Sequence, residues 1–470
     1  MDGYAFPIYP YSTTAPTGVE ATLQVLCKPT TEGWKKLQGF GPRGVSHTTH
    51  IFFILLLIMS TIGEEQGMTG DATMSLFGDI VVLDLTSTIR GMHCTKMFGD
   101  YGAEVILIEP PGGSFARQVG PFAHGKEDPE TSLHFAHHNR NKKSITLNLQ
   151  TPRGQELLRD LARSADLLVE DMPVGALAAL GFGYEQLHTI NPMLVYCSIT
   201  GFGQTGPYAS YKTSNIVEDA MGGLMGITGP ADHPPTMTGA QQAEHATAMH
   251  AAYASAAALL FRDLHGVGQH IDVAAQECVA NVLENAIEQY TYTGVVRKRA
   301  GSRHGTAWPC TVFPCKDGYI GMCCTQLKEI RAAVLLAGDM ELADDPVLQN
   351  QFERRARADE LEPRLIAGYM KQGKAELFHQ GQALGCPIAM TSDAHDLATD
   401  PHLNEVGFFD EFDHPVIGKY KDIAAPVYFT ATPGVMRSSA PLLGQHTAEV
   451  LSRLGIDDAG FSRLHADNVI

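Results

Sequence analysis

From residue 77 onward, short apolar runs alternate with segments that have the pattern of helices, and the joints between them are short. The run DIVVLDLT at 79–86 is rich in β-branched and aliphatic residues and closes with turn-forming residues. Such runs are typical of strands that are buried on both faces of a parallel sheet. Further runs of this kind lie at 103–113, 144–149, 166–171, 193–203 and 266–273.

Helices are expected between these runs. Residues 91–102 form one helical segment closed by glycine, and residues 151–165 form an amphipathic one. The second segment opens with Thr151 and Pro152, a helix cap followed by proline at the first helical position. Alternating strands and helices with short joints predict an α/β fold with an open, doubly wound and mostly parallel sheet.

The 470 residues, 44% of them hydrophobic, suffice for two or three domains. We expect residues 76–290 to form the first part of a large α/β domain. Residues 295–395 are expected to form a smaller α+β domain, because a hairpin at 316–324 is followed by long charged helices. Short strands and turns at 400–456 predict a return to the large domain, and 457–470 is expected to be a tail.

Residues 1–75 lack this periodicity and are expected to be a poorly ordered N-terminal extension. Their one apolar run, Ile51–Met59, is shorter than the ~20 residues that a membrane-spanning helix needs. It also lies too far from the N-terminus for an ordinary signal peptide. We therefore expect a cytoplasmic protein without a membrane partner, with an anchoring role for this run as the alternative.

The net charge of −18 is unfavourable for binding nucleic acid or an anionic membrane. An anionic ligand would need a local basic pocket. The nine cysteines, odd in number and irregular in spacing, indicate reduced intracellular thiols. Four of them cluster, but their spacing is poor for zinc, so we predict buried thiols on strands and no metal. These four are Cys310, Cys315, Cys323 and Cys324.

The sequence GFGQTG at 201–206 matches the glycine pattern of a dinucleotide-binding loop. That pattern binds pyrophosphate only where a helix begins directly after it. Here Pro207 follows, which favours a turn, and the motif comes late in the chain. No nicotinamide or flavin cofactor is therefore expected.

Two other segments carry charge that could do chemistry. Arg140, Lys142 and Lys143 stand before the strand at 144–149, as either a solvated charge run or a clamp for a phosphorylated ligand. Glu244 opens an alanine-rich helix, where the helix dipole favours a negative charge. It is either a helix-start charge or an ionised carboxylate able to act as a nucleophile.

In this order, the segments resemble the class III CoA-transferase family, of the formyl-CoA and carnitine CoA-transferase type. The resemblance covers about residues 77–456. It is carried by VVLDLT…MFGDYGAEVILIEPPGG, by NRNKKSITLNLQTPRGQELLRDLARSADLLVED and by the most specific segment, ALGFGYEQLHTINPMLVYCSITGFGQTGPY. FRDLHGVGQHIDVAAQE, RAGSRHG at 299–305 and PCKDGYI complete it.

The resemblance implies a doubly wound CoA-binding domain, a smaller second domain and two chains threaded as interlocked rings. It implies transfer of CoA from an acyl-CoA to a free carboxylic acid, with CoA as substrate and no tightly bound cofactor. In this family an aspartate attacks the thioester and forms a mixed anhydride, then an enzyme–CoA thioester. Splitting one exchange into easier steps is covalent catalysis, and water must be excluded because an anhydride hydrolyses.

The family aspartate opens the alanine-rich helix, fifteen or sixteen positions before its end. Fifteen positions before Leu259 is Glu244, one methylene longer, and sixteen is Ala243. The resemblance therefore makes Glu244 the expected nucleophile. The alternative is a retained charge without transferase chemistry. Gly301 and Gly305 are candidates for the family's glycine loop over the intermediate.

Two cations that relatives use for CoA are missing from this chain. EDMPVG at 170–175 lacks the arginine of the family motif, and Ala179 stands where relatives have arginine. Binding of CoA is therefore expected from Arg117, Arg140, Lys142 and Lys143.

The racemase branch of the same fold uses a His-Asp pair, which would fall at Ser214 and Asn215. Neither is a base, although His245 beside Glu244 could restore proton transfer. An acyl-CoA isomerase or epimerase remains one alternative. The other is a non-catalytic subunit, in a heterodimer with a homologue, in place of an interlocked homodimer.

Overall fold

The computed structural model describes residues 74–305 and 307–470. The expected N-terminal extension at 1–75, including Ile51–Met59, lies outside these residues except for its last two positions. No helix within the two described ranges is long and apolar enough to cross a membrane.

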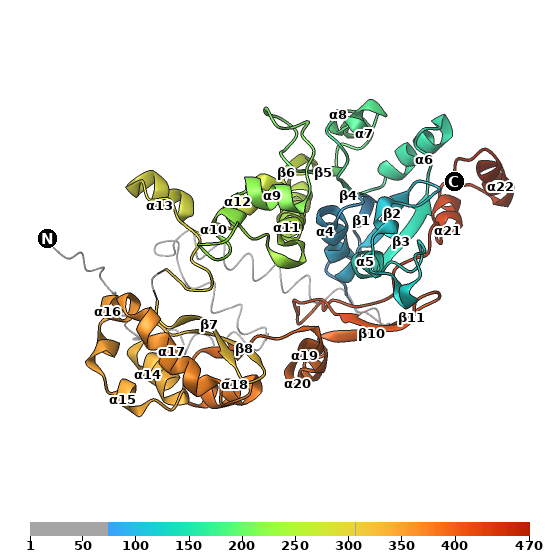
Figure 1. Ribbon diagram of the computed structural model, residues 1–470. Coiled ribbons are helices and arrows are strands. Elements are labelled where there is room, and N and C mark those ends of the chain that lie inside the picture. Colours follow the sequence, from blue (N-terminus) through green and yellow to red (C-terminus); the bar gives the residue numbers. More distant parts are fainter. Residues whose placement is uncertain (1–73, 306) are drawn as a thin grey trace, which may run out of the picture. The chain divides into compact units, whose positions relative to one another are not determined.

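A six-stranded sheet forms the centre of the large α/β part (Figure 1). Its order is β3-β2-β1-β4-β5-β6, and every neighbouring pair is parallel. This confirms the predicted parallel sheet. The chain builds outward from β1 to β3, then returns to the other side of β1 with β4. The strands are β1 (Val81–Leu85), β2 (Glu104–Glu109), β3 (Lys142–Thr146), β4 (Leu167–Glu170), β5 (Val195–Thr200) and β6 (His270–Ala274).

Both faces of this sheet are buried, each in its own hydrophobic cluster. In β1, Leu83 and Leu85 belong to one cluster and Val82 to the other. Because side chains alternate between the faces of a strand, a strand covered on both faces is apolar throughout. This is the physical reason for the continuous apolar runs in the sequence.

Helices cover each face. On one face lie α4 (Ile89–Asp100) and α11 (Gln242–His265), which pack closely against each other. On the other face lie α6 (Pro152–Ala162) and α8 (Tyr184–Ile190). The start of α6 is as predicted, since the Thr151 side chain accepts a hydrogen bond from Gly154 N and Pro152 is the first helical residue.

Shorter elements connect these layers. The helices are α5 (Leu133–Asn139), α7 (Ala176–Ala179), α9 (Asn215–Met221), α10 (Leu224–Ile227), α12 (Ala275–Asn281) and α13 (Ala286–Thr293). The 3₁₀ turns are η1 (Phe115–Gln118), η2 (Ala123–Gly125) and η3 (Gly239–Gln241). Residues 201–206, which match a dinucleotide motif, form bends after β5, and a turn follows at 207–210, as expected from Pro207.

A second core surrounds a three-stranded antiparallel sheet, β7-β8-β9. The hairpin was predicted at 316–324, but its first strand lies earlier, at β7 (Cys310–Cys315). The dipeptide Lys316-Asp317 is the turn, because polar turn residues separate two runs that both alternate in burial. The other strands are β8 (Gly318–Cys323) and β9 (Ile388–Met390). The helices here are α14 (Leu327–Leu336), α15 (Met340–Ala343), η4 (Pro346–Gln349), α16 (Gln351–Ala356), α17 (Ala358–Tyr369) and α18 (Lys374–Ala383).

The last part of the chain contains a hairpin and four short helices. These are α19 (Ala394–Thr399), α20 (Pro401–Glu405), β10 (Phe409–His414), β11 (Gly418–Ile423), α21 (Thr447–Ser452) and α22 (Asp458–Ala466). Residues 457–470 are more than a tail, because Leu464, Val469 and Ile470 are buried in the core of the large sheet.

Candidate active site

The site lies beyond the carboxyl ends of β1 and β4, where the strand order changes direction. In doubly wound sheets this switch point is the usual place for a ligand. The chain leaves β1 and enters α4, whose first backbone N–H groups have no partner within the helix. Asp171, directly after β4, accepts hydrogen bonds from Ser87 N at 3.1 Å and Thr88 N at 2.8 Å.

Glu244 adds a second carboxylate at this end of α4. Its Oε2 accepts a hydrogen bond from Ile89 N at 3.0 Å, and the residue is 9% exposed. Its own N–H donates to Asn215 Oδ1 at 3.4 Å. The Glu244 carboxylate therefore accepts a hydrogen bond from a neighbouring helix, α4. A charge that only stabilised the start of its own helix would not need this contact.

The start of α11 is strained where it positions Glu244. Ala240 and Gln241 both have left-handed backbone angles, with φ of 54° and 52°. Residues with a side chain rarely adopt this conformation, and such strain concentrates at functional sites.

Two further charged residues lie near Glu244. Arg90 and Glu218 form a buried ion pair, and Glu218 is fully buried. Burial raises the pKa of the Glu244 carboxyl above its usual value, and the nearby Arg90 guanidinium opposes this shift. From the sequence, the dipole of α11 is expected to keep Glu244 ionised, but desolvation is the larger effect here. Arg90 was not singled out from the sequence, although a cation in the first turn of the helix after the first strand is a visible signal.

The predicted CoA-binding cations occupy other surroundings. Lys142 and Lys143 are the first residues of β3, whereas the sequence placed them before the strand. The ammonium of Lys142 lies 2.9 Å from Asp84 Oδ2 and donates to Met92 O, Thr95 Oγ1 and Asn139 Oδ1. Lys143 is partly exposed and pairs with Glu104 at 2.6 Å and Glu449 at 2.7 Å.

Arg117 and Arg140 are also enclosed by acceptors. Arg140 is fully buried and pairs with Asp100 at 2.9 Å and Asp422 at 3.3 Å. Arg117 is 1% exposed, pairs with Glu109 at 2.8 Å and also donates to Glu130. In this structure Arg117, Arg140 and Lys142 therefore neutralise buried carboxylates and present no open charge.

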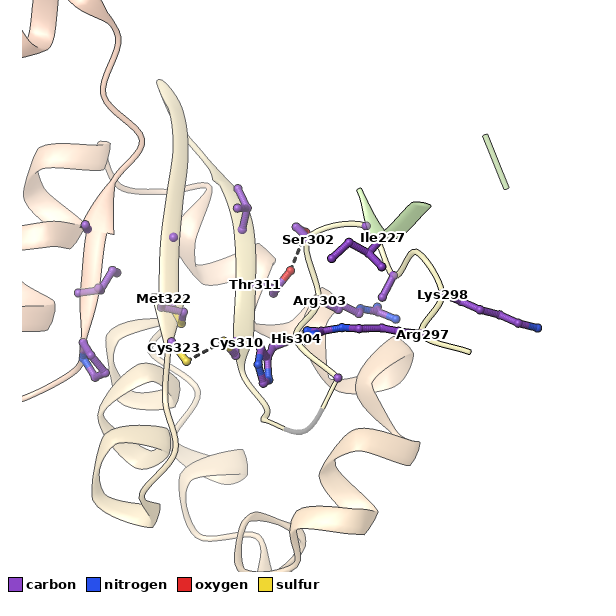
Figure 2. Close-up of a pocket in the computed structure, with 18 of the residues that line it drawn as sticks. Ile227, Arg297, Lys298, Ser302, Arg303, His304, Cys310, Thr311, Met322 and Cys323 are labelled. Carbon is purple, nitrogen blue, oxygen red and sulfur yellow. Dashed lines mark hydrogen bonds between the residues drawn. The ribbon is translucent and has the colours of Figure 1, made fainter. Parts of the chain in front are cut away.

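Gly301 and Gly305 line a hollow of about 790 Å³ between the loop at 297–305 and the β7-β8 hairpin (Figure 2). Gly301 has φ of 65°, a conformation that favours glycine, and its N–H donates to Gly229 O at 3.1 Å. Glu244 does not line this hollow. The two glycines therefore line the same hollow, and Glu244 is not part of its lining.

This loop itself carries several basic side chains. Arg297 pairs with Glu284 at 2.7 Å, and Arg303 pairs with Glu362 at 2.6 Å and Asp359 at 2.8 Å. Lys298 is exposed and extends away from the strands in Figure 2.

The clustered cysteines divide by exposure. Cys315 and Cys324 are buried as predicted, whereas Cys310 is partly exposed and Cys323 exposed. Cys310 and Cys323 face each other across β7 and β8 with their sulfurs 2.7 Å apart. Within the described residues, the side-chain groups with metal-ligand spacing contain histidine and aspartate and no cysteine.

The fold is a doubly wound α/β sheet, and two carboxylates, Asp171 and Glu244, meet the start of α4 at its switch point. The model of CoA-transferase family III matches residues 77–447, and the chain belongs to this family. It is an enzyme of the class III CoA-transferase type, a class that acyl-CoA and carboxylic acid substrates fit.

Characterised relatives and a solved structure agree with this assignment. The chain is 33% identical over 399 residues to the succinyl-CoA–D-citramalate CoA-transferase of Chloroflexus aurantiacus, covering 83% of this chain and 97% of the relative. It is 33% identical over 391 residues to the succinyl-CoA:glutarate CoA-transferase of Mus musculus, covering 83% and 89%. A crystal structure of a CAIB/BAIF family protein from Brucella suis superposes with a TM-score of 0.74 at 30% identity, covering 81% of this chain and 99% of that one.

Proposed function

We propose that this enzyme moves CoA from an acyl-CoA to a free carboxylic acid with Glu244 as the covalent nucleophile. The observation that carries the proposal is the position of the Glu244 carboxylate. It is held by Ile89 N at the start of α4, at the switch point of the sheet. A carboxylate held there by a backbone donor is oriented before any substrate arrives.

The reaction proceeds in four nucleophilic steps, each of which forms or breaks a bond to the Glu244 carboxyl group. Glu244 attacks the thioester carbonyl, the C–S bond breaks, and CoA thiolate leaves a mixed anhydride behind. The thiolate attacks the glutamyl carbonyl, releases the donor acid and forms a glutamyl-CoA thioester. The acceptor carboxylate attacks this thioester and again frees CoA thiolate. The thiolate then attacks the acceptor carbonyl, which releases the new acyl-CoA and restores Glu244.

Attack requires the ionised form of Glu244, and burial makes ionisation harder. Arg90 supplies the opposing positive charge. The same burial limits the access of water to the anhydride and thioester. The site thus combines a desolvated nucleophile with one nearby cation that favours its ionised form.

The donor we propose is succinyl-CoA, and the acceptor a small dicarboxylic acid. The support is that the two relatives described above are named for succinyl-CoA and for D-citramalate or glutarate. We further propose that the loop at 297–305 contacts the phosphates of CoA, with Lys298 at its rim and the glycines allowing close approach. The support is that this loop lines an open hollow, whereas Arg117, Arg140 and Lys142 are enclosed by carboxylates.

We also propose that the active form is a dimer. The segment around α13 exposes a run of large apolar side chains, which a soluble monomer rarely does. These are Ile287, Tyr290, Tyr292, Val295 and Val296. Sedimentation of the full chain at several concentrations tests this, and addition of a homologous chain distinguishes a homodimer from a heterodimer.

The deciding experiment traps the intermediate. The full chain is incubated with succinyl-CoA, reduced with borohydride and analysed by peptide mass mapping. Reduction of an anhydride or thioester at Glu244 converts its side chain to an alcohol, which is the expected result. Acetyl-CoA and unloaded CoA are the comparison ligands.

The matched control is Glu376→Gln, which removes an exposed glutamate from the first turn of α18. That variant should trap as the unmodified chain does, whereas Glu244→Gln should not. Unmodified Glu244 in a chain that still binds CoA would overturn the proposal. Loss of an α-deuterium from the acyl-CoA would then indicate an isomerase, and activity restored by a homologue would indicate a partner subunit.

A further inference from the structure

Five histidine rings from three helices lie together beside the start of α11. We call them the histidine cluster: His93 of α4, His134, His137 and His138 of α5, and His245 of α11. The ring centres of His93 and His245 are 4.9 Å apart, and those of His137 and His138 are 4.7 Å apart. The ring centres of His93 and His138 are 5.6 Å apart. Neither the family resemblance nor the proposed transfer reaction uses these rings.

The cluster contains polar atoms without a partner. Nδ1 of His93 and Nδ1 of His138 are buried and have no hydrogen-bond partner among the described residues. His138 as a whole is 4% exposed. A buried polar group that lacks a partner is destabilising, and a bound ion is one explanation for such a group in a native protein.

Three of the rings have the spacing of metal ligands. One nitrogen from each of His93, His137 and His138 lies within 4.8 Å of the others. Bonds of about 2.0–2.1 Å from a tetrahedral zinc ion place ligand nitrogens roughly 3.4 Å apart. The three nitrogens therefore lie at most about 1.4 Å farther apart than a zinc ion would hold them.

His137 is already oriented as metal ligands are. Its Nδ1 lies 2.9 Å from Asp422 Oδ1 of β11, which leaves Nε2 for another partner. Metal-binding histidines almost always place their second nitrogen against a carboxylate or carbonyl in this way.

The nearby positive charges are compensated. Lys96 on α4 pairs with Asp100 at 2.7 Å, and Arg140 after α5 pairs with Asp100 and Asp422. These carboxylates offset the charge that would otherwise repel a cation.

We propose that His93, His137 and His138 bind one divalent transition-metal ion of the class that prefers imidazole, such as Zn²⁺. Three protein ligands leave a fourth position for a water molecule or a carboxylate oxygen. Imidazole nitrogen discriminates against Mg²⁺ and Ca²⁺, which take oxygen ligands. The ion would link α4 to α5, and His245, next to Glu244 along α11, borders the site.

The test is titration of the full chain with Zn²⁺ after removal of metals by a chelator, followed by calorimetry, with no acyl-CoA present. We expect one equivalent to bind per chain, Mg²⁺ not to compete, and Co²⁺ to give the visible absorption of a nitrogen-ligated site. His93→Gln and His137→Gln should each weaken binding at least about tenfold. His137 is partly exposed, so its variant should fold, which circular dichroism verifies.

The chain offers a matched control in Asp393, His395 and Asp396, the other described group with ligand spacing. It is largely exposed, and Asp396 already accepts from Lys374 and from Asp393 N. His395→Gln should leave Zn²⁺ binding unchanged. The proposal is overturned if the unmodified chain does not bind Zn²⁺, or if binding survives in the folded His93 and His137 variants. Since no transfer is measured, failure of the Glu244 mechanism would not affect the result.

Discussion

The surroundings of Glu244 and the loop at 297–305 differ in how deeply their charged groups are buried. Around Glu244, the charged groups Arg90, Glu218 and Asp171 are bonded to fixed partners. In the loop, Arg297, Lys298 and Arg303 are partly or fully exposed beside an open hollow. A covalent step gains from fixed charges in a desolvated site, whereas phosphate groups are bound by cations that remain accessible.

The segment at 140–143 shows why local charge density does not locate a ligand. The sequence suggested it as a clamp for a phosphorylated ligand, yet Arg140 and Lys142 are enclosed by carboxylates and carbonyls. These two cations are therefore buried with their partners, whereas Lys298 in the loop at 297–305 is exposed.

The largest effect is expected from Glu244→Gln, which removes the nucleophile from the buried region. Transfer should fall by at least about 10³-fold, measured as kcat for succinyl-CoA and glutarate. Glu244→Asp retains a carboxylate but shifts it by about a bond length, and should cost roughly 10²-fold. Full activity in Glu244→Gln, with Glu376→Gln as control, would place catalysis elsewhere.

Lys142→Met tests whether the basic stretch is structural. The change leaves Asp84 buried without its cation, so the free energy of unfolding should fall by about 3–5 kcal/mol, measured with urea. Lys298→Met, at an exposed position of the loop, should change it by less than about 0.5 kcal/mol. Equal losses in both variants would remove the distinction between the two regions.

The pH dependence of kcat/KM tests the desolvation of Glu244. Because the neutral carboxyl cannot attack, activity should be full above the raised pKa of Glu244 and lost as the pH falls through it. That loss should occur above pH 4.5, the ordinary glutamate value. Arg90→Gln removes the charge that lowers this pKa and should move the loss to higher pH. An unchanged profile in Arg90→Gln would argue against an ionising Glu244 in catalysis.

The smallest effect is expected from Lys298→Ala. One exposed charge contributes up to about 1 kcal/mol, so the KM for acyl-CoA should rise by no more than about fivefold, with kcat and stability retained. Added salt should reduce the difference between the two proteins, because exposed charges are screened. A loss of kcat without a change in KM would contradict a role in binding CoA.

The amino-acid sequence determined the parallel sheet, the cap of α6 and the family, because each depends on neighbours in the chain. Apolar runs indicate strands buried on both faces, and Thr151-Pro152 indicates the start of a helix. Neither signal depends on residues that are distant in the chain. The sequence also placed Glu244 at the start of its helix. The start of β3 was placed two residues late, because the charges of Lys142 and Lys143 hid their place in a strand.

The partners of these side chains were decided only by the tertiary structure. Lys142 meets Asp84 58 positions earlier in the chain, and Glu244 meets Ile89 across 155 positions. The histidine cluster likewise joins three helices that are far apart in the sequence. Strand order and helix packing bring such residues together. A residue's immediate neighbours reveal its charge and periodicity, but not which distant group will neutralise that charge once both are buried.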